Sequence, residues 1–123
     1  MYKSDFCQVD YIENKNVVLV SWKKYCSHND YRKPLQHAIE IMNKHKSCNY
    51  AADTRNGFEN HPDDTQWVAD YFFPKAAEAG CRYIYFIIDK ENSLRNELEG
   101  QENLSSGLAF RYIYSIDEIA EVR

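Results

Sequence analysis

Residues 82–88 read RYIYFII, and this segment is the most strand-like part of the chain. Its hydrophobicity is nearly continuous, whereas a strand with one face in water alternates polar and apolar residues. Continuous runs of this kind are typical of parallel strands that are covered on both faces. We therefore expect residues 82–88 to form a central strand of a sheet.

Four further runs of β-branched and aromatic residues predict strands. Residues 6–12 (FCQVDYI) and 17–23 (VVLVSWK) flank a short polar turn, which is typical of an antiparallel hairpin. Residues 48–52 (CNYAA) form a short apolar run that leads into a polar loop, and residues 108–114 (LAFRYIY) form the last strand.

An amphipathic helix is expected between the second and third of these strands. It should span about 12 to 15 residues, because apolar side chains recur there at the 3.6-residue period. Pro34 is expected in its first turn, where a missing N–H costs little. The predicted inward stripe is Leu35, Ala38, Ile39 and Met42.

A second helix is expected after His61-Pro62. Asp63 and Asp64 are expected to cap it and to favour its positive end. Pro74 predicts a kink or a break, and Gly80 predicts the C-terminal stop. The predicted inward stripe is Trp67, Val68, Tyr71 and Phe72.

Two shorter helices complete the predicted order. One covers residues 91–99, where Leu94 and Leu98 share a face, and a closing helix buries Ile116 and Ile119. The 123 residues suffice for one domain, so residues 1–123 are predicted to form a single-domain α/β fold. The order β-β-α-β-α-β-α-β-α predicts a mixed sheet, with an N-terminal antiparallel hairpin followed by parallel strands that crossover helices connect.

The composition limits the classes of partner. The net charge is −4, so no overall basic field attracts nucleic acid, and no apolar window is long enough for a membrane span. The start of the chain lacks a secretory pattern, which favours the cytoplasm. The ten tyrosines leave a homodimer open as an alternative to a monomer.

Cysteine and histidine spacing does not predict a metal site. The four cysteines contain no CxxC pair, and the four histidines contain no HxH or HxxxH pair. We expect free thiols. Cys48 and Cys81 begin strands that are predicted to be parallel neighbours, so these two thiols could approach each other.

Four short motifs stand out along the chain: Val18-Leu19-Val20-Ser21-Trp22-Lys23, Ala52-Asp53-Thr54-Arg55-Asn56, Gln66-Trp67 and the stretch from Phe73-Pro74 to Ala79-Gly80. Taken with the order of elements, they resemble the STAS/SpoIIAA-like family, in particular its uncharacterised bacterial branch. The resemblance covers nearly the whole chain, and it implies a mixed sheet, no cofactor and no enzymatic activity. Members of this family regulate partner proteins, and related folds bind lipids.

The chain departs from that family at its switch loop. Where the family reads Asp-Ser-Ser-Gly and phosphorylates the second serine, this chain reads Asp53-Thr54-Arg55-Asn56. An arginine therefore stands at the position of the phosphate acceptor. Thr54 remains as a neighbouring hydroxyl that could be phosphorylated.

The loop after the third predicted strand is the predicted binding site, because parallel sheets bind ligands at the carboxyl ends of their strands. Arg55 offers a forked cation to a phosphate or a carboxylate. Alternatively, Asp53 and Arg55 tie their own loop together with an ion pair. The full predicted site is Asp53, Thr54, Arg55, Asn56, Trp22, Tyr25 and Trp67, in which the three aromatic residues line an apolar slot.

These features predict a non-enzymatic STAS-like regulatory or binding domain with no catalytic residue. It is expected to act through a partner protein or through a small apolar or anionic ligand at this loop. The alternative is a small hydrolase or transferase that uses Cys26, His28 and Asp53, which requires the three groups to converge.

Overall fold

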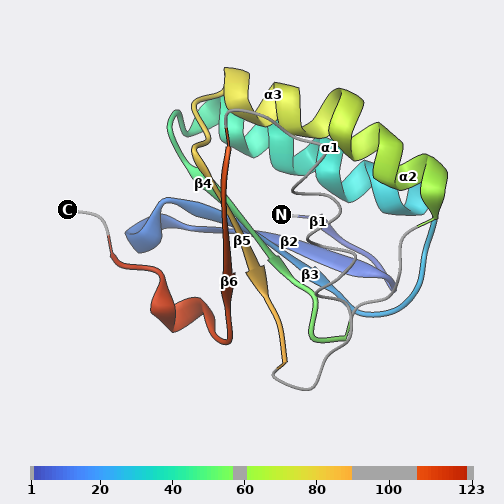
Figure 1. Cartoon of the computed structure of the whole chain (residues 1–123), viewed down its shortest axis with the longest axis horizontal. Helices are drawn as coiled ribbons and strands as arrows, with labels where there is room; N and C mark the ends of the chain where they lie inside the picture. Colours follow the sequence, from blue (N-terminus) through green and yellow to red (C-terminus); the bar gives the residue numbers. More distant parts are fainter. Residues whose placement is uncertain (1, 57–60, 90–107, 122–123) are drawn as a thin grey trace.

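Six strands form one mixed sheet in the computed structural model, which describes residues 2–56, 61–89 and 108–121 (Figure 1). The strands lie in the sheet in the order in which they occur in the sequence. They are β1 (Tyr2–Lys3), β2 (Cys7–Ile12), β3 (Val17–Trp22), β4 (Asn49–Asp53), β5 (Tyr83–Ile87) and β6 (Ala109–Ile113).

The pairing confirms the predicted α/β class and mixed sheet. The strands β2 and β3 form the antiparallel hairpin, which turns through a single 3-10 turn at Glu13–Lys15. The strands β3, β4, β5 and β6 are parallel to their neighbours. Two details differ from the prediction. The strand β1 is absent from it, because two residues are too few to show a pattern. The strand β5, predicted to be central, is internal, but β3 and β4 occupy the centre of the sheet.

The described residues include three α-helices, and these lie on one face of the sheet (Figure 1). They are α1 (Asn29–Lys44), α2 (Pro62–Trp67) and α3 (Phe73–Glu78). The helix α1 is longer at its start than predicted, so Pro34 lies inside it rather than in its first turn. The ring of Pro34 is fully buried in the core, and this burial offsets the hydrogen bond that the proline removes.

The predicted break at Pro74 does not occur. The chain stays helical from α2 to α3 through a π-helical turn at Val68–Phe72, in which the N–H of Phe73 donates to the carbonyl of Val68, five residues back. This wider turn makes room for the proline ring. It also moves the inward stripe by one residue, which is why Tyr71 is exposed although the 3.6-residue period predicts it inside.

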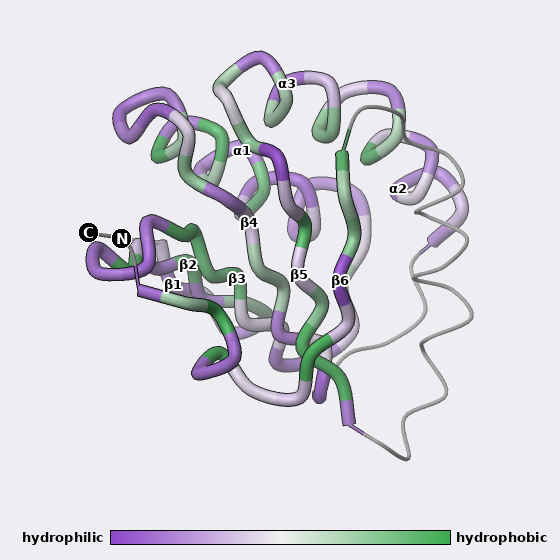
Figure 2. Tube along the Cα trace, turned by 60° about the vertical axis from the view of Figure 1, so that its left-hand side comes forward, coloured by the Kyte–Doolittle hydropathy of each residue, from purple (hydrophilic) through white to green (hydrophobic). Residues whose placement is uncertain are grey.

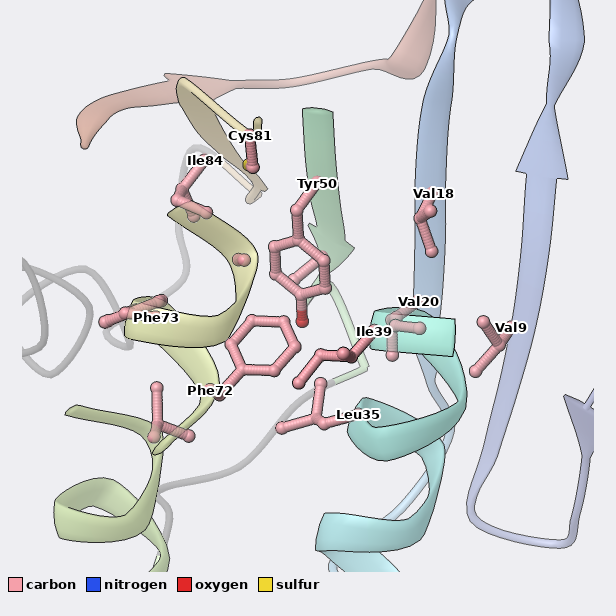
Figure 3. Close-up of a cluster of buried hydrophobic side chains, with 14 of the residues drawn as sticks. Val9, Val18, Val20, Leu35, Ile39, Tyr50, Phe72, Phe73, Cys81 and Ile84 are labelled. Carbon is pink, nitrogen blue, oxygen red and sulfur yellow. The ribbon is translucent and has the colours of Figure 1, made fainter. Parts of the chain in front are cut away.

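The main core lies between the helices and the sheet (Figure 3). The ring of Phe72 packs edge-on against Tyr50 of β4, with 4.9 Å between centroids, and Leu35 of α1 lies beside them. Figure 2 shows the helices alternating hydrophobic with hydrophilic residues along the chain. This alternation is the pattern expected of helices with one face on a core.

The C-terminal segment packs against the opposite face of the sheet. Instead of the predicted closing helix, it forms one 3-10 turn at Ile116–Glu118, which a capping box of Ser115 and Glu118 stabilises. Ile119 is then buried beside Val17, and its carbonyl accepts a hydrogen bond from the Lys15 ammonium at 2.6 Å. The expected apolar contact is thus made by an extended chain.

Other predictions have simple outcomes. The helix predicted at residues 91–99 lies outside the described residues. The helical stop at Gly80 is confirmed, since this residue has a φ of +99° that side chains with a Cβ rarely adopt. Within the described ranges, every helix is too short or too polar to cross a bilayer.

Candidate functional site

The carboxyl ends of the parallel strands meet at one edge of the sheet. The register aligns Ser21 of β3 with Asp53 of β4, and Asp53 with Ile87 of β5. The segments that follow these strands therefore leave from the same edge, as the sequence predicts. They carry most of the predicted site residues.

Asp53 and Arg55 form an ion pair with each other. The Arg55 guanidinium donates from Nε to one oxygen of Asp53 at 3.0 Å and from its terminal nitrogen to the other at 2.7 Å. The backbone N–H of Arg55 also donates to Asp53. The alternative in which the two residues tie their own loop together is confirmed, while Asn56 beside them is exposed.

The charges at this loop are mutually compensated. Burial alone would raise the pKa of Asp53, but the hydrogen bonds and the positive charge of Arg55 outweigh it and hold the pKa below its ordinary value. The hydrogen bonds to Asp53 in turn raise the pKa of Arg55, with a smaller contribution from the charge of Asp89. An incoming anion would therefore meet two carboxylates as well as the guanidinium.

Thr54 is a structural residue of this loop. Its side chain is buried, and both its hydroxyl and its backbone N–H donate to the carbonyl of Ile87 at 2.9 Å. The threonine thereby joins the end of β4 to the end of β5. Phosphorylation of Thr54 would require the loop to open first.

The three predicted slot residues have different environments. Trp22 is buried and stacks on Tyr31 of α1, with 4.7 Å between centroids. Tyr25 is 54% exposed. Trp67 is partly buried against the main core, stacks on Tyr71 and lies under the Arg32 guanidinium. Trp22 therefore serves the core, Tyr25 is mostly exposed, and Trp67 is partly buried.

The sequence predicts Asp64 only as a cap of the second helix, but the structure buries this carboxylate next to the same edge of the sheet. Asp64 is fully buried, and both of its oxygens accept the backbone N–H of His28, at 2.9 and 3.1 Å. One oxygen also accepts from Nε of Arg32 at 3.0 Å. Asp64 therefore joins the start of α2 to the start of α1, rather than capping α2 as predicted.

The cap of α2 is His61, whose Nδ1 accepts the backbone N–H of Asp63 at 3.1 Å. This arrangement brings His28, His61 and Asp63 together, with their nitrogen and carboxylate oxygen atoms within 4.8 Å of one another. The spacing rules missed this cluster because His28 is distant in the sequence from the other two residues. The hydrogen bonds of the buried Asp64 hold the start of α1, with His28, next to the start of α2.

The three groups of the alternative enzyme have other partners. Cys26 is buried, and this burial, with the charges of Asp30 and Asp64, raises the pKa of its thiol to about 11. The ring of His28 faces Asp63 at 3.5 Å, and Asp53 binds Arg55. Within the described ranges, no hydrogen bond or ion pair joins any two of Cys26, His28 and Asp53.

The cysteines follow the expectation from their spacing. All four are free and buried, and burial raises the pKa of Cys48 to about 11 and of Cys81 to about 12. A thiol that stays protonated at neutral pH is a poor nucleophile. These residues therefore act as small apolar core residues.

No protein-family model matches this sequence, and no curated protein is significantly similar to it. The resemblance to the STAS/SpoIIAA-like family therefore stays a prediction that rests on the motifs themselves.

Proposed function

We propose that this chain is a non-enzymatic, STAS-like binding domain of the cytoplasm, and that a partner protein contacts it at the carboxyl edge of the sheet. The observation that carries the proposal is that internal hydrogen bonds hold the start of the loop after β4, while two side chains there stay exposed. Asp53 and Thr54 fix the loop after β4 by internal hydrogen bonds, while Arg55 and Asn56 remain exposed. Residues that internal hydrogen bonds already hold lose little conformational entropy when a partner binds them.

A partner protein fits this edge better than a free anion does. The fork of Arg55 is occupied by Asp53, and Asp89 adds a second negative charge near it. A small anion would have to displace a carboxylate, whereas a protein surface can dock on the compensated pair as it stands. The exposed ring of Tyr25 supplies the kind of amphipathic contact that is common in protein interfaces.

Site-specific photocrosslinking tests the proposal. A photoreactive residue is placed at Asn56 in the full chain in its own host, and a matched one is placed at Glu78, which is exposed on α3. We expect one specific crosslinked protein from position 56 only. The product should disappear in Arg55→Glu and persist in Arg82→Glu, because Arg82 is exposed at the opposite end of β5. Equal crosslinking from both positions would contradict the proposal.

A small apolar or anionic ligand is the second candidate, since Arg55 retains an exposed guanidinium. Native mass spectrometry of the purified chain separates the two candidates and also gives the number of subunits. A retained small molecule that Arg55→Ala removes, in a variant that still folds, would replace the partner protein. A mass increase of about 80 Da that Thr54→Val removes would show phosphorylation of Thr54, which requires that this buried residue becomes accessible.

A further inference from the structure

The cluster of His28, His61 and Asp63 has the donor set of a metal site. Two imidazoles and one carboxylate present one donor atom each within 4.8 Å of one another. The closest approaches are 3.5 Å from His28 Nε2 and 3.8 Å from His61 Nδ1, both to the same oxygen of Asp63. The centroids of the His28 and His61 rings lie 4.7 Å apart. Nitrogen and oxygen donors in this combination suit borderline divalent ions such as Zn²⁺.

The backbone holds His28 at this position in an unfavourable conformation. Its φ is +52° and its ψ is −122°, a combination that residues with a Cβ rarely adopt. The carboxylate of Asp64 keeps it there by accepting the His28 N–H with both oxygens, and Arg32 holds that carboxylate. Strained residues that a buried hydrogen-bond network keeps in place are concentrated at functional sites.

The charges around the cluster favour a cation. The guanidinium of Arg32 is compensated by Asp64, so the negative charge of Asp63 remains for the cluster. All three side chains are partly open to solvent, which gives an ion a route of entry and leaves coordination positions for water. We propose that His28, His61 and Asp63 bind one Zn²⁺ ion per chain, independently of the proposed partner contact.

Binding requires only side-chain movements. Ligand atoms of a tetrahedral zinc site lie about 3.3–3.6 Å apart, given bond lengths of about 2.0–2.2 Å. The 3.5 Å from His28 Nε2 to the Asp63 oxygen already fits this range, whereas the 3.8 Å from His61 Nδ1 to that oxygen must shorten by rotation of partly exposed side chains. His61 must also give up its hydrogen bond from the Asp63 N–H, because a neutral imidazole has one free nitrogen lone pair and Nδ1 now uses it for the cap.

Zinc titration of the reduced full chain by calorimetry tests the proposal. We expect one Zn²⁺ per chain and a loss of affinity in His28→Ala, Asp63→Asn and His61→Asn. Removal of a direct ligand should cost more than the roughly 10–100-fold that removal of an outer-shell partner costs. His61→Asn is chosen because asparagine also caps helices well, so the variant loses the imidazole while α2 keeps a cap.

The matched control is His37→Ala. His37 lies on α1 beside the carboxylate of Glu40 at 3.6 Å, so it is a histidine–carboxylate pair outside the cluster. We expect its Zn²⁺ affinity to equal that of the wild type. A substitution of Co²⁺ for Zn²⁺ should give a spectrum without thiolate bands. The proposal would be overturned if the wild type bound Zn²⁺ no more tightly than His28→Ala does, or if His37→Ala lost as much affinity as the cluster variants. Thiolate bands from the cysteines in the Co²⁺ spectrum would also overturn it.

Discussion

Two Asp–Arg pairs lie near the carboxyl edge, and they differ in almost every physical respect. Asp53 and Arg55 are two residues apart on one loop, and their side chains are 19% and 45% exposed. Asp64 and Arg32 come from different helices, and their side chains are 0% and 27% exposed. The distances are similar, at 2.7 and 3.0 Å. The contact distance alone therefore says little about what each pair contributes.

Burial decides the difference between the pairs. An exposed carboxylate that loses its arginine regains water, so such pairs are worth about 0–1 kcal/mol. Asp64 is out of contact with water, and it accepts hydrogen bonds from the backbone of His28 and the side chain of Arg32, both at the start of α1. The local pair shapes its own loop, whereas the buried pair fixes how the start of α1 meets the start of α2.

The largest effect should follow Asp64→Ala. The variant leaves the Arg32 guanidinium and the His28 N–H without their buried acceptor, which is expected to cost about 3–5 kcal/mol of unfolding free energy. Urea denaturation followed by circular dichroism measures it. The control is Asp63→Ala, because this neighbour is exposed and should cost less than about 1 kcal/mol. Equal losses of unfolding free energy in the two variants would mean that the burial of Asp64 adds nothing to its contribution to stability.

A double-mutant cycle should then separate the two pairs. The coupling of Asp64 with Arg32 is expected to lie near the upper part of the roughly 0.5–3 kcal/mol range for contacting residues. The coupling of Asp53 with Arg55 should be below about 1 kcal/mol. The cycle is needed because Arg32→Ala also removes the contact with the Trp67 ring. Similar coupling energies would mean that burial does not make the Asp64–Arg32 pair stronger than the Asp53–Arg55 pair.

The same contrast explains what the sequence could predict. The strands, the α/β class and the Asp53–Arg55 pair depend on local pattern, and the structure confirms them. The role of Asp64 depends on a contact between distant segments, and its neighbour Asp63 looks identical in the sequence. A helix start with two acidic residues is normally explained by capping. Only the packing of α2 against α1 shows which of the two is buried.

The exposure of Tyr71 has a similar origin. A constant 3.6-residue period places it inward, but the π turn before Pro74 adds one residue and rotates the following stripe. The proline gives a signal that something changes there. The presence of a proline does not determine whether a break, a kink or a wider turn results, because each relieves the same steric clash.

A smaller effect of opposite sign is expected for His28→Gly. Glycine adopts positive φ without the steric cost that His28 bears, so the variant should be more stable by about 1 kcal/mol. Thermal and urea unfolding measure the gain. Asn29→Gly is the control, since Asn29 is helical and glycine there should destabilise slightly. Loss of stability in His28→Gly would mean that the imidazole contacts outweigh the backbone strain.

The smallest effect concerns the exposed pair, and pH makes it measurable. The pKa of Asp53 is below its ordinary value of 3.8 in the folded chain, so its stabilising contribution is present above that pH and is lost as the pH falls through the folded pKa. The unfolding free energies of wild type and Asp53→Asn should therefore differ by less than about 1 kcal/mol at neutral pH and converge in acid. High salt should also reduce the difference, because the pair is partly exposed. A difference that grows toward acid would have the wrong sign for a carboxylate that arginine stabilises, and the local pair would then need another explanation.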